Sequence, residues 1–240
     1  MAALPTTLDD AIAQAKTATQ TALEKGYTRL QVEFLFPELK PIPVAHQFVD
    51  LFAEYGETLK VFFTDAGAAA LVRRDWGAVP FKIHSLDVAG SRQTTSVQEQ
   101  ISDDDRIFLF VAPTAVEAGP VEQICEAVGD RPVVLLNPRL EDFATVGIGY
   151  AGRQLRMRFL STFEPAYYLR PLDEAALFRC YPDLWQIWST ENDDYTLLGE
   201  EFQKPDSDTL ELILAKARST QNANQGLFSG LQKLLRGLGS

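Results

Sequence analysis

The sequence has few of the residues that build metal centres, disulfides and membrane spans. Its 240 residues include two histidines, which exclude a multi-histidine metal site, and two cysteines, Cys125 and Cys180. These cysteines lie far apart without a CxxC motif, so we expect neither a disulfide framework nor a zinc knuckle, and a reducing cytoplasm is the expected location. The longest apolar run, residues 107–112, is far shorter than the roughly 20 residues that cross a bilayer. We therefore expect no membrane span, and the N-terminus lacks the profile of a signal peptide.

Basic charge is also scarce. The chain has 22 Lys and Arg against 33 Asp and Glu, a formal net charge of −11. Nucleic-acid binding depends on clustered Lys and Arg, so this balance argues against a nucleic-acid partner. From Leu212 onward there are four basic residues and no acidic one, so the acidic excess lies in residues 1–211. An acidic body with a basic tail can orient a protein at a charged surface.

Common catalytic and cofactor motifs are missing, because the sequence has no GxSxG, HExxH or GxxxxGK segment. We therefore expect no catalytic residue, metal or cofactor, and an enzyme is the less favoured interpretation. One segment, GIGYAG at 147–152, has the glycine spacing of a dinucleotide fingerprint. In that fold the glycines lead from a strand into a helix. Residues 153–159 alternate with period two as a strand does, so we interpret the match as accidental and the glycines as a turn or bulge.

The first 140 residues alternate between helical and strand-like periodicity. The pattern predicts helices at 6–25, 43–55, 66–76 and 120–128, and strands at 28–36, 59–63, 81–86, 106–112 and 131–137. Near-continuous apolar strands that alternate with helices are typical of a parallel sheet covered on both faces. The predicted class is an α/β fold with a doubly wound, mostly parallel sheet flanked by helices.

After Asn137 this alternation stops. The sequence predicts strands at 152–160, 164–170, 184–190 and 195–202, as antiparallel additions in the C-terminal half, and then a helix at 205–218. Asp208 and Glu211 have capping-box spacing in that helix. We expect residues 1–217 to form a single α/β domain, with the parallel core at 1–140 and a β-rich extension and closing helix at 141–217.

Two groups of residues are candidates for binding a ligand. Ligands of open α/β sheets bind at the carboxyl ends of the strands, where Asp65, Thr114 and Asn137 are expected; alternatively, these side chains only cap the following helices or turns. The second group lies on the expected 152–160 strand, where arginines could hold a phosphate or carboxylate, or form a solvated face. This group consists of Arg153, Arg156 and Arg158, the last two on one strand face.

The C-terminal end predicts a polar linker at 218–226 and an amphipathic helix at 227–240. Contact with an anionic membrane, with a partner groove and with its own domain all remain open. The expected contact residues are Leu227, Phe228, Leu231, Lys233, Leu234, Leu235, Arg236 and Leu238.

Four blocks of sequence together resemble a known family. They are AIAQAKTATQTALEKGYTRLQVEFLFPEL, VVLLNPRLED, GIGYAGRQLRMRFLSTFEPAYYLRPL and LFRCYPDLWQIW. This combination is similar to a cyanobacterial and chloroplast domain family that includes the "low photosystem II accumulation" assembly factor and a domain fused to plastid adenylate kinase. The resemblance covers about residues 5–217 and brings no catalytic residues.

The resemblance implies a role at photosynthetic membranes. The leading hypothesis is a non-enzymatic accessory or assembly protein, peripheral at the thylakoid, whose partner is a photosystem subunit or assembly factor. The alternative is a binding protein for a nucleotide or another phosphorylated small molecule, held at the carboxyl ends of the parallel strands.

Overall fold

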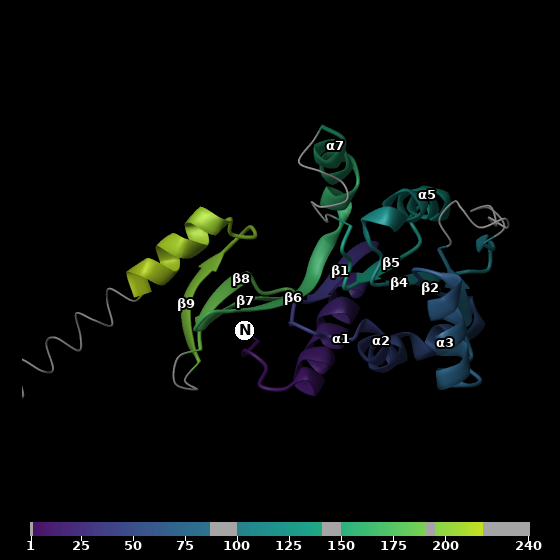
Figure 1. The fold of residues 1–240 in the computed structure, drawn as a ribbon, viewed down its shortest axis with the longest axis horizontal. Coiled ribbons are helices and arrows are strands. Elements are labelled where there is room, and N and C mark those ends of the chain that lie inside the picture. The colour runs from purple at the N-terminus through teal and green to yellow at the C-terminus, as the bar shows by residue number, and fades with distance from the viewer. Residues whose placement is uncertain (1, 87–99, 141–149, 191–194, 218–240) are drawn as a thin grey trace, which may run out of the picture. The chain divides into compact units, whose positions relative to one another are not determined.

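The nine strands form one mixed sheet in the order β3-β2-β4-β5-β1-β6-β7-β8-β9 (Figure 1). The computed structural model describes residues 2–86, 100–140, 150–190 and 195–217. The chain divides into two compact units, Met1–Arg170 with Arg179–Asp183, and Pro171–Phe178 with Leu184–Ser240. The predicted α/β class, with parallel strands first and antiparallel strands towards the C-terminus, is confirmed.

The first unit contains a six-stranded parallel sheet. Each neighbouring pair in it runs parallel. Three of its strands are buried along their whole length, which explains their continuous apolar sequence. The strands are β1 (Arg29–Phe34), β2 (Leu59–Phe63), β3 (Lys82–Ser85), β4 (Ile107–Val111), β5 (Val133–Leu136) and β6 (Glu164–Leu172).

Helices cover both faces of this sheet. On one face lie α1 (Leu8–Glu24), α2 (Pro41–Phe48) and α3 (Ala66–Trp76), and on the other α5 (Ala118–Val128) and α7 (Tyr150–Arg158) (Figure 1). A 3₁₀ segment, η1 (Val49–Thr58), continues α2. The chain leaves β1 towards α2 and leaves the neighbouring β5 towards α7, on opposite faces. The carboxyl ends of β1 and β5 are therefore a topological switch point of the doubly wound sheet.

The prediction of a strand at 152–160 is wrong, because these residues lie in α7. Leu155 and Phe159 are buried in the core cluster beside α5, whereas Met157, between them, is 73% exposed. The buried pair has helical i, i+4 spacing, so the apparent alternation of three apolar residues misled the prediction. The 164–170 strand is also not an antiparallel addition, because β6 pairs in parallel with β1.

The second unit contains antiparallel strands and a helix. Its strands are β7 (Ala175–Cys180), β8 (Trp185–Ser189) and β9 (Thr196–Glu201), and the last two residues of β7 belong to the first unit. β7 pairs with β8 and β8 pairs with β9, both antiparallel. A helix at 207–217 follows. Asp206, rather than Asp208, caps this helix, since the Thr209 N–H donates to Asp206 Oδ1 over 2.8 Å.

Candidate functional site

An open cavity of about 580 Å³ lies at the carboxyl ends of the parallel strands. Its lining comes from the carboxyl end of β1 and the segment that follows it (Phe34, Leu35, Phe36, Pro37, Leu39 and Pro41), from Ala112 and Thr114 after β4, and from residues 137–139 after β5. The β1 and β5 ends are the switch point of the sheet, the place where open α/β sheets bind ligands. Its volume also falls within the roughly 300–1,000 Å³ typical of ligand pockets. We therefore take this cavity as the candidate site.

The backbone around the cavity is strained. Among the described residues, four that are not glycine have positive φ angles. Ala112 and Asn137, both at φ 50°, line the cavity, and Glu38, at φ 62°, lies between the lining residues Pro37 and Leu39. This conformation costs most residues with a Cβ roughly 1–2 kcal/mol, and asparagine less. Strain of this kind collects at functional sites, so it independently marks this cavity.

Asn137 joins the ends of β5 and β1. Its Oδ1 accepts the N–H of Phe34 over 2.8 Å, and its own N–H donates to the carbonyl of Val32 over 2.7 Å. Because Oδ1 is the acceptor, Nδ2 is the side chain's remaining donor. Among the described residues Nδ2 has no partner.

Thr114, the second predicted residue at the cavity, also caps a helix. It precedes the 3₁₀ turn η2 (Ala115–Glu117) that leads into α5, and its hydroxyl donates to Glu117 Oε2 over 2.6 Å. Its own N–H donates to the same carboxylate over 2.8 Å, and its Oγ1 accepts the N–H of Val116 over 3.3 Å. This capping box satisfies the first amides of the turn internally, so they are not free to hold a phosphate.

The remaining predicted strand-end residue, Asp65, is not among the residues that line the cavity. Its Oδ1 accepts the N–H of Ala68 over 2.9 Å and caps α3. The capping alternative considered for this residue therefore describes its position in the structure.

Arg139 lines the cavity but is not among the residues predicted from the sequence. This exposed residue is the one charged side chain among the described lining residues, and no described residue forms an ion pair with it. A backbone bridge next to β4 holds it, with the Arg139 N–H donating to the carbonyl of Pro113 over 2.7 Å. Its position depends on β4 and β5 being neighbours.

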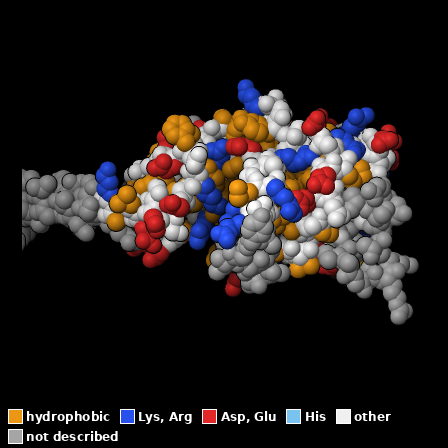
Figure 2. Space-filling model, turned by 90° about the horizontal axis from the view of Figure 1, so that it is seen from above, with side chains coloured by type: hydrophobic (Ala, Val, Ile, Leu, Met, Phe, Trp, Pro, Cys, Tyr) orange, Lys and Arg blue, Asp and Glu red, His pale blue; other side chains and the backbone are white. Residues whose placement is uncertain are grey.

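The predicted arginine group does not line the cavity. Arg153, Arg156 and Arg158 lie on α7, and because residues two apart point to different sides of a helix, Arg156 and Arg158 do not share a face. Arg158 instead forms two 2.8 Å contacts with the carboxylate of Glu122 on α5. On the face shown in Figure 2, basic and acidic side chains are intermingled over the described surface.

The glycine segment needs a different explanation from the one the sequence suggested. Residues 147–149 lie outside the described residues, but α7 begins at Tyr150 and includes Gly152. A helix does follow the glycines, so the strand argument against a dinucleotide fingerprint is wrong. The spacing still differs from the fingerprint, in which the glycines turn directly from strand into helix, because β5 ends at Leu136, well before Gly147.

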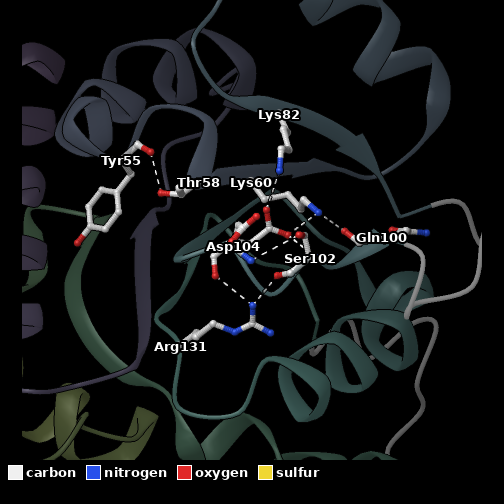
Figure 3. Close-up of polar contacts among 9 residues, drawn as sticks. Tyr55, Thr58, Lys60, Lys82, Gln100, Ser102, Asp104 and Arg131 are labelled. Atoms are coloured by element: carbon white, nitrogen blue, oxygen red, sulfur yellow. Dashed lines mark hydrogen bonds and ion pairs between the residues drawn. The ribbon is translucent and has the colours of Figure 1, made fainter.

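A cluster of charged side chains around the buried Asp105 lies at the opposite, amino-terminal edge of the sheet. Lys60 and Lys82 converge on the segment that contains Ser102 and Asp104 (Figure 3). Asp105, fully buried, lies 2.6 Å from Lys60 Nζ and 3.1 Å from Lys82 Nζ, and it accepts the N–H of Ser102 over 2.7 Å. Burial would raise the pKa of Asp105, but these hydrogen bonds together hold it below its ordinary value.

This cluster connects elements of the first unit. Arg131, just before β5, donates to the carbonyls of Ser102 and Asp105 over 2.8 and 3.0 Å. The charged side chains of this cluster are therefore already paired with one another or with backbone carbonyls of the first unit, which indicates a structural role. Among the described residues, no group of His, Cys, Asp and Glu side chains could hold a metal ion.

The two cysteine side chains are poor nucleophiles. Burial raises the pKa of Cys125 to about 12 and that of Cys180 to about 11. The thiolate is the reactive form of cysteine, and it is scarce at neutral pH for both residues.

A comparison with protein families assigns the chain. A family model described as "Domain of unknown function (DUF1995)" matches residues 5–212. The chain belongs to the DUF1995 family. The match includes every segment that lines the cavity, so the cavity lies within the DUF1995 domain. In the described part of this DUF1995 protein, no helix has the length and apolar character needed to span a membrane. The amphipathic segment at 227–240 lies outside both the match and the described residues.

Proposed function

We propose that this DUF1995 protein is a non-enzymatic accessory protein that binds a photosystem subunit or assembly factor at photosynthetic membranes. The observation that favours this most is the strained, open cavity at the ends of β1, β4 and β5. Most of its described lining residues are apolar, and Leu35 on its rim is 37% exposed. Apolar walls with a few polar groups are typical of binding sites.

Binding is favoured over catalysis by the chemistry of the lining. The described lining residues include no Asp, Glu, His, Cys or Lys. General acid–base catalysis needs a group that exchanges protons near neutral pH, and the described lining residues supply no carboxylate, imidazole, thiol or amine for that role. The cavity is therefore suited to holding a ligand without transforming it.

The photosynthetic part of the proposal comes from the four sequence blocks. Their resemblance to the family of the "low photosystem II accumulation" factor, and to the domain fused to plastid adenylate kinase, favours a peripheral location at the thylakoid. The amphipathic pattern of residues 227–240, with its basic polar face, offers a second contact with the membrane or the partner.

A pull-down from detergent-solubilised photosynthetic membranes tests this proposal. The baits are the full chain, Leu35→Glu at the cavity rim, a chain that lacks residues 219–240, and Leu71→Glu as the matched control. Leu71 is similarly exposed, at 39%, but lies on α3 and not at the cavity. We expect a photosystem subunit or assembly factor to be recovered with the full chain and with Leu71→Glu, and lost with Leu35→Glu. Recovery of no such protein by the full chain contradicts the proposal.

The second candidate is a nucleotide or other phosphorylated small molecule in the same cavity. It is favoured by Asn137 at the end of β5, whose Nδ2 donor has no partner among the described residues, with Arg139, rather than Arg156 or Arg158, as the cation. A thermal-shift screen against nucleotides and sugar phosphates tests it, because a ligand at 100 times its Kd adds about 2.7 kcal/mol of stability. No shift with any of these compounds excludes this candidate.

A further inference from the structure

The polar side-chain groups of the cavity that have no partner among the described residues are hydrogen-bond donors. The hydroxyl of Thr114 already donates to Glu117, and Asn137 Oδ1 already accepts the N–H of Phe34. Among the described residues, Asn137 Nδ2 and the guanidinium of Arg139 remain as groups without a partner. A ligand that complements this cavity therefore presents oxygen acceptors, and the positive charge of Arg139 favours an anion.

The cavity is suited to one negative charge rather than several. Arg139 is the one cation among the described lining residues, and the capping box has used the amides that could hold a phosphate. The carboxylate of Glu117, which is 7% exposed, lies directly behind Thr114 and repels further anionic charge. A carboxylate matches this arrangement better than a polyphosphate, because a planar guanidinium can donate two parallel hydrogen bonds to it.

The rest of the lining calls for an apolar ligand body. Phe34, Leu35, Phe36 and Pro138 form walls beside the donors. The cavity is open, with Leu35 and Arg139 on its exposed rim. Because this cavity of about 580 Å³ is open rather than enclosed, it suits a short peptide segment that lies against its walls better than a long acyl chain, which needs to be surrounded.

We infer that the cavity binds a short apolar peptide segment that carries one carboxylate, with the carboxylate on Arg139 and Asn137 and the apolar side chains against Leu35 and Phe36. This inference rests on the proposed function, because it specifies the chemistry of the partner segment that the cavity recognises. The carboxylate is the C-terminal end of the partner chain.

Direct binding of synthetic peptides to the full chain tests this inference. The probes are fluorescently labelled N-acylated tetrapeptides of Leu, Val, Ile and Phe, each made as the free acid and as the C-terminal amide. The competitors are the unlabelled peptides, decanoate and inorganic phosphate. Loss of one charge-assisted hydrogen-bonded pair weakens binding about tenfold or more. We expect the best free acids to bind at least about tenfold more tightly than their amides.

Variants locate the carboxylate. Arg139→Gln is expected to remove the preference for the acid, whereas Arg74→Gln keeps it, because Arg74 is an exposed arginine on α3 away from the cavity. Equal affinity for acid and amide, an unchanged preference in Arg139→Gln, or no binding of any free acid overturns the inference. Displacement of the peptide by decanoate at lower concentration than by the unlabelled peptide, or by phosphate alone, also overturns it.

The proposed function and this inference can fail separately. If the pull-down recovers a photosystem subunit in a Leu35-dependent way while acids and amides bind equally, only the carboxylate inference is wrong. If the acids bind selectively but the pull-down recovers no photosynthetic protein, the photosynthetic assignment is wrong.

Discussion

Replacement of Asn137 separates its structural role from its binding role. Asn137→Ala places alanine at φ 50°. Alanine has no side-chain amide to form a local hydrogen bond there, so this backbone conformation costs it roughly 1–2 kcal/mol. It also removes Oδ1, the acceptor of the Phe34 N–H at 2.8 Å, and an unsatisfied, partly buried donor costs about 1–3 kcal/mol. The expected loss in the free energy of unfolding is therefore about 2–5 kcal/mol.

Asn137→Asp provides the matched comparison. Aspartate also tolerates positive φ, and its carboxylate oxygen still accepts the Phe34 N–H, so we expect stability within about 1 kcal/mol of the wild type. The same change replaces the Nδ2 donor with a negative charge, so it should abolish binding of an anionic ligand.

Urea unfolding followed by circular dichroism measures both free energies of unfolding. If Asn137→Ala is as stable as the wild type, the hydrogen bond and the strained backbone do not have the energetic role assigned to them here. If Asn137→Asp is as unstable as Asn137→Ala, the hydrogen-bond argument in particular is wrong.

Three further predictions concern the first unit. Asp105→Asn leaves Lys60, whose side chain is 4% exposed, without its buried counter-charge, so we expect the free energy of unfolding, measured in urea, to fall by about 3–5 kcal/mol. Adding Lys60→Met to Asp105→Asn should recover part of this loss. A loss below about 1 kcal/mol for Asp105→Asn contradicts the pairing. Burial, followed by the charges of Lys60 and neighbouring cations, lowers the pKa of His84 to about 4 from 6.5. As pH falls, His84 therefore takes up a proton in the unfolded chain at a higher pH than in the folded protein, so the free energy of unfolding falls between about pH 6.5 and pH 4. His84→Gln should flatten this part of the plot of stability against pH. An unchanged plot refutes the assignment. Leu155→Ala should lower the free energy of unfolding by about 2–5 kcal/mol because Leu155 is buried, whereas Met157→Ala should change it by less than about 0.5 kcal/mol. Equal losses would indicate a strand, in which both side chains share a face, rather than α7.

Much of the fold could be predicted because local pattern and burial agree there. The continuous apolar runs of β2, β4 and β5 lie in a sheet covered on both faces. The predicted helix at 66–76 has the bounds of α3, since Asp65 caps its start and Gly77, at φ 66°, follows its end.

Two elements could not be predicted from local pattern. In α7, Leu155, Met157 and Phe159 satisfy the period of a strand as well as helical i, i+4 spacing, and only packing beside α5 decides between them. β7 was not predicted, because Arg179 interrupts its apolar run. That arginine is buried all the same, since its guanidinium donates to the carbonyl of Pro165 and to Glu164.

The candidate site was predicted in part. The general rule for strand ends indicated Thr114 and Asn137, and both line the cavity. Arg139 could not be identified, because its place beside Thr114 depends on the spatial order of the strands, which no local pattern contains. The contact residues predicted in the tail, such as Leu231 and Lys233, lie outside the described residues, so their role stays a prediction.

Site-specific photo-crosslinking in a photosynthetic cell tests most directly whether the cavity is the partner-binding surface. A photoreactive phenylalanine analogue would replace Leu35 at the cavity rim in one variant and Leu71 on α3 in the other, two positions of similar exposure. The account predicts a crosslink from position 35 to a photosystem subunit or assembly factor, identified by mass spectrometry, and none to that protein from position 71. A crosslink to that protein from position 71 but not from position 35 would contradict it.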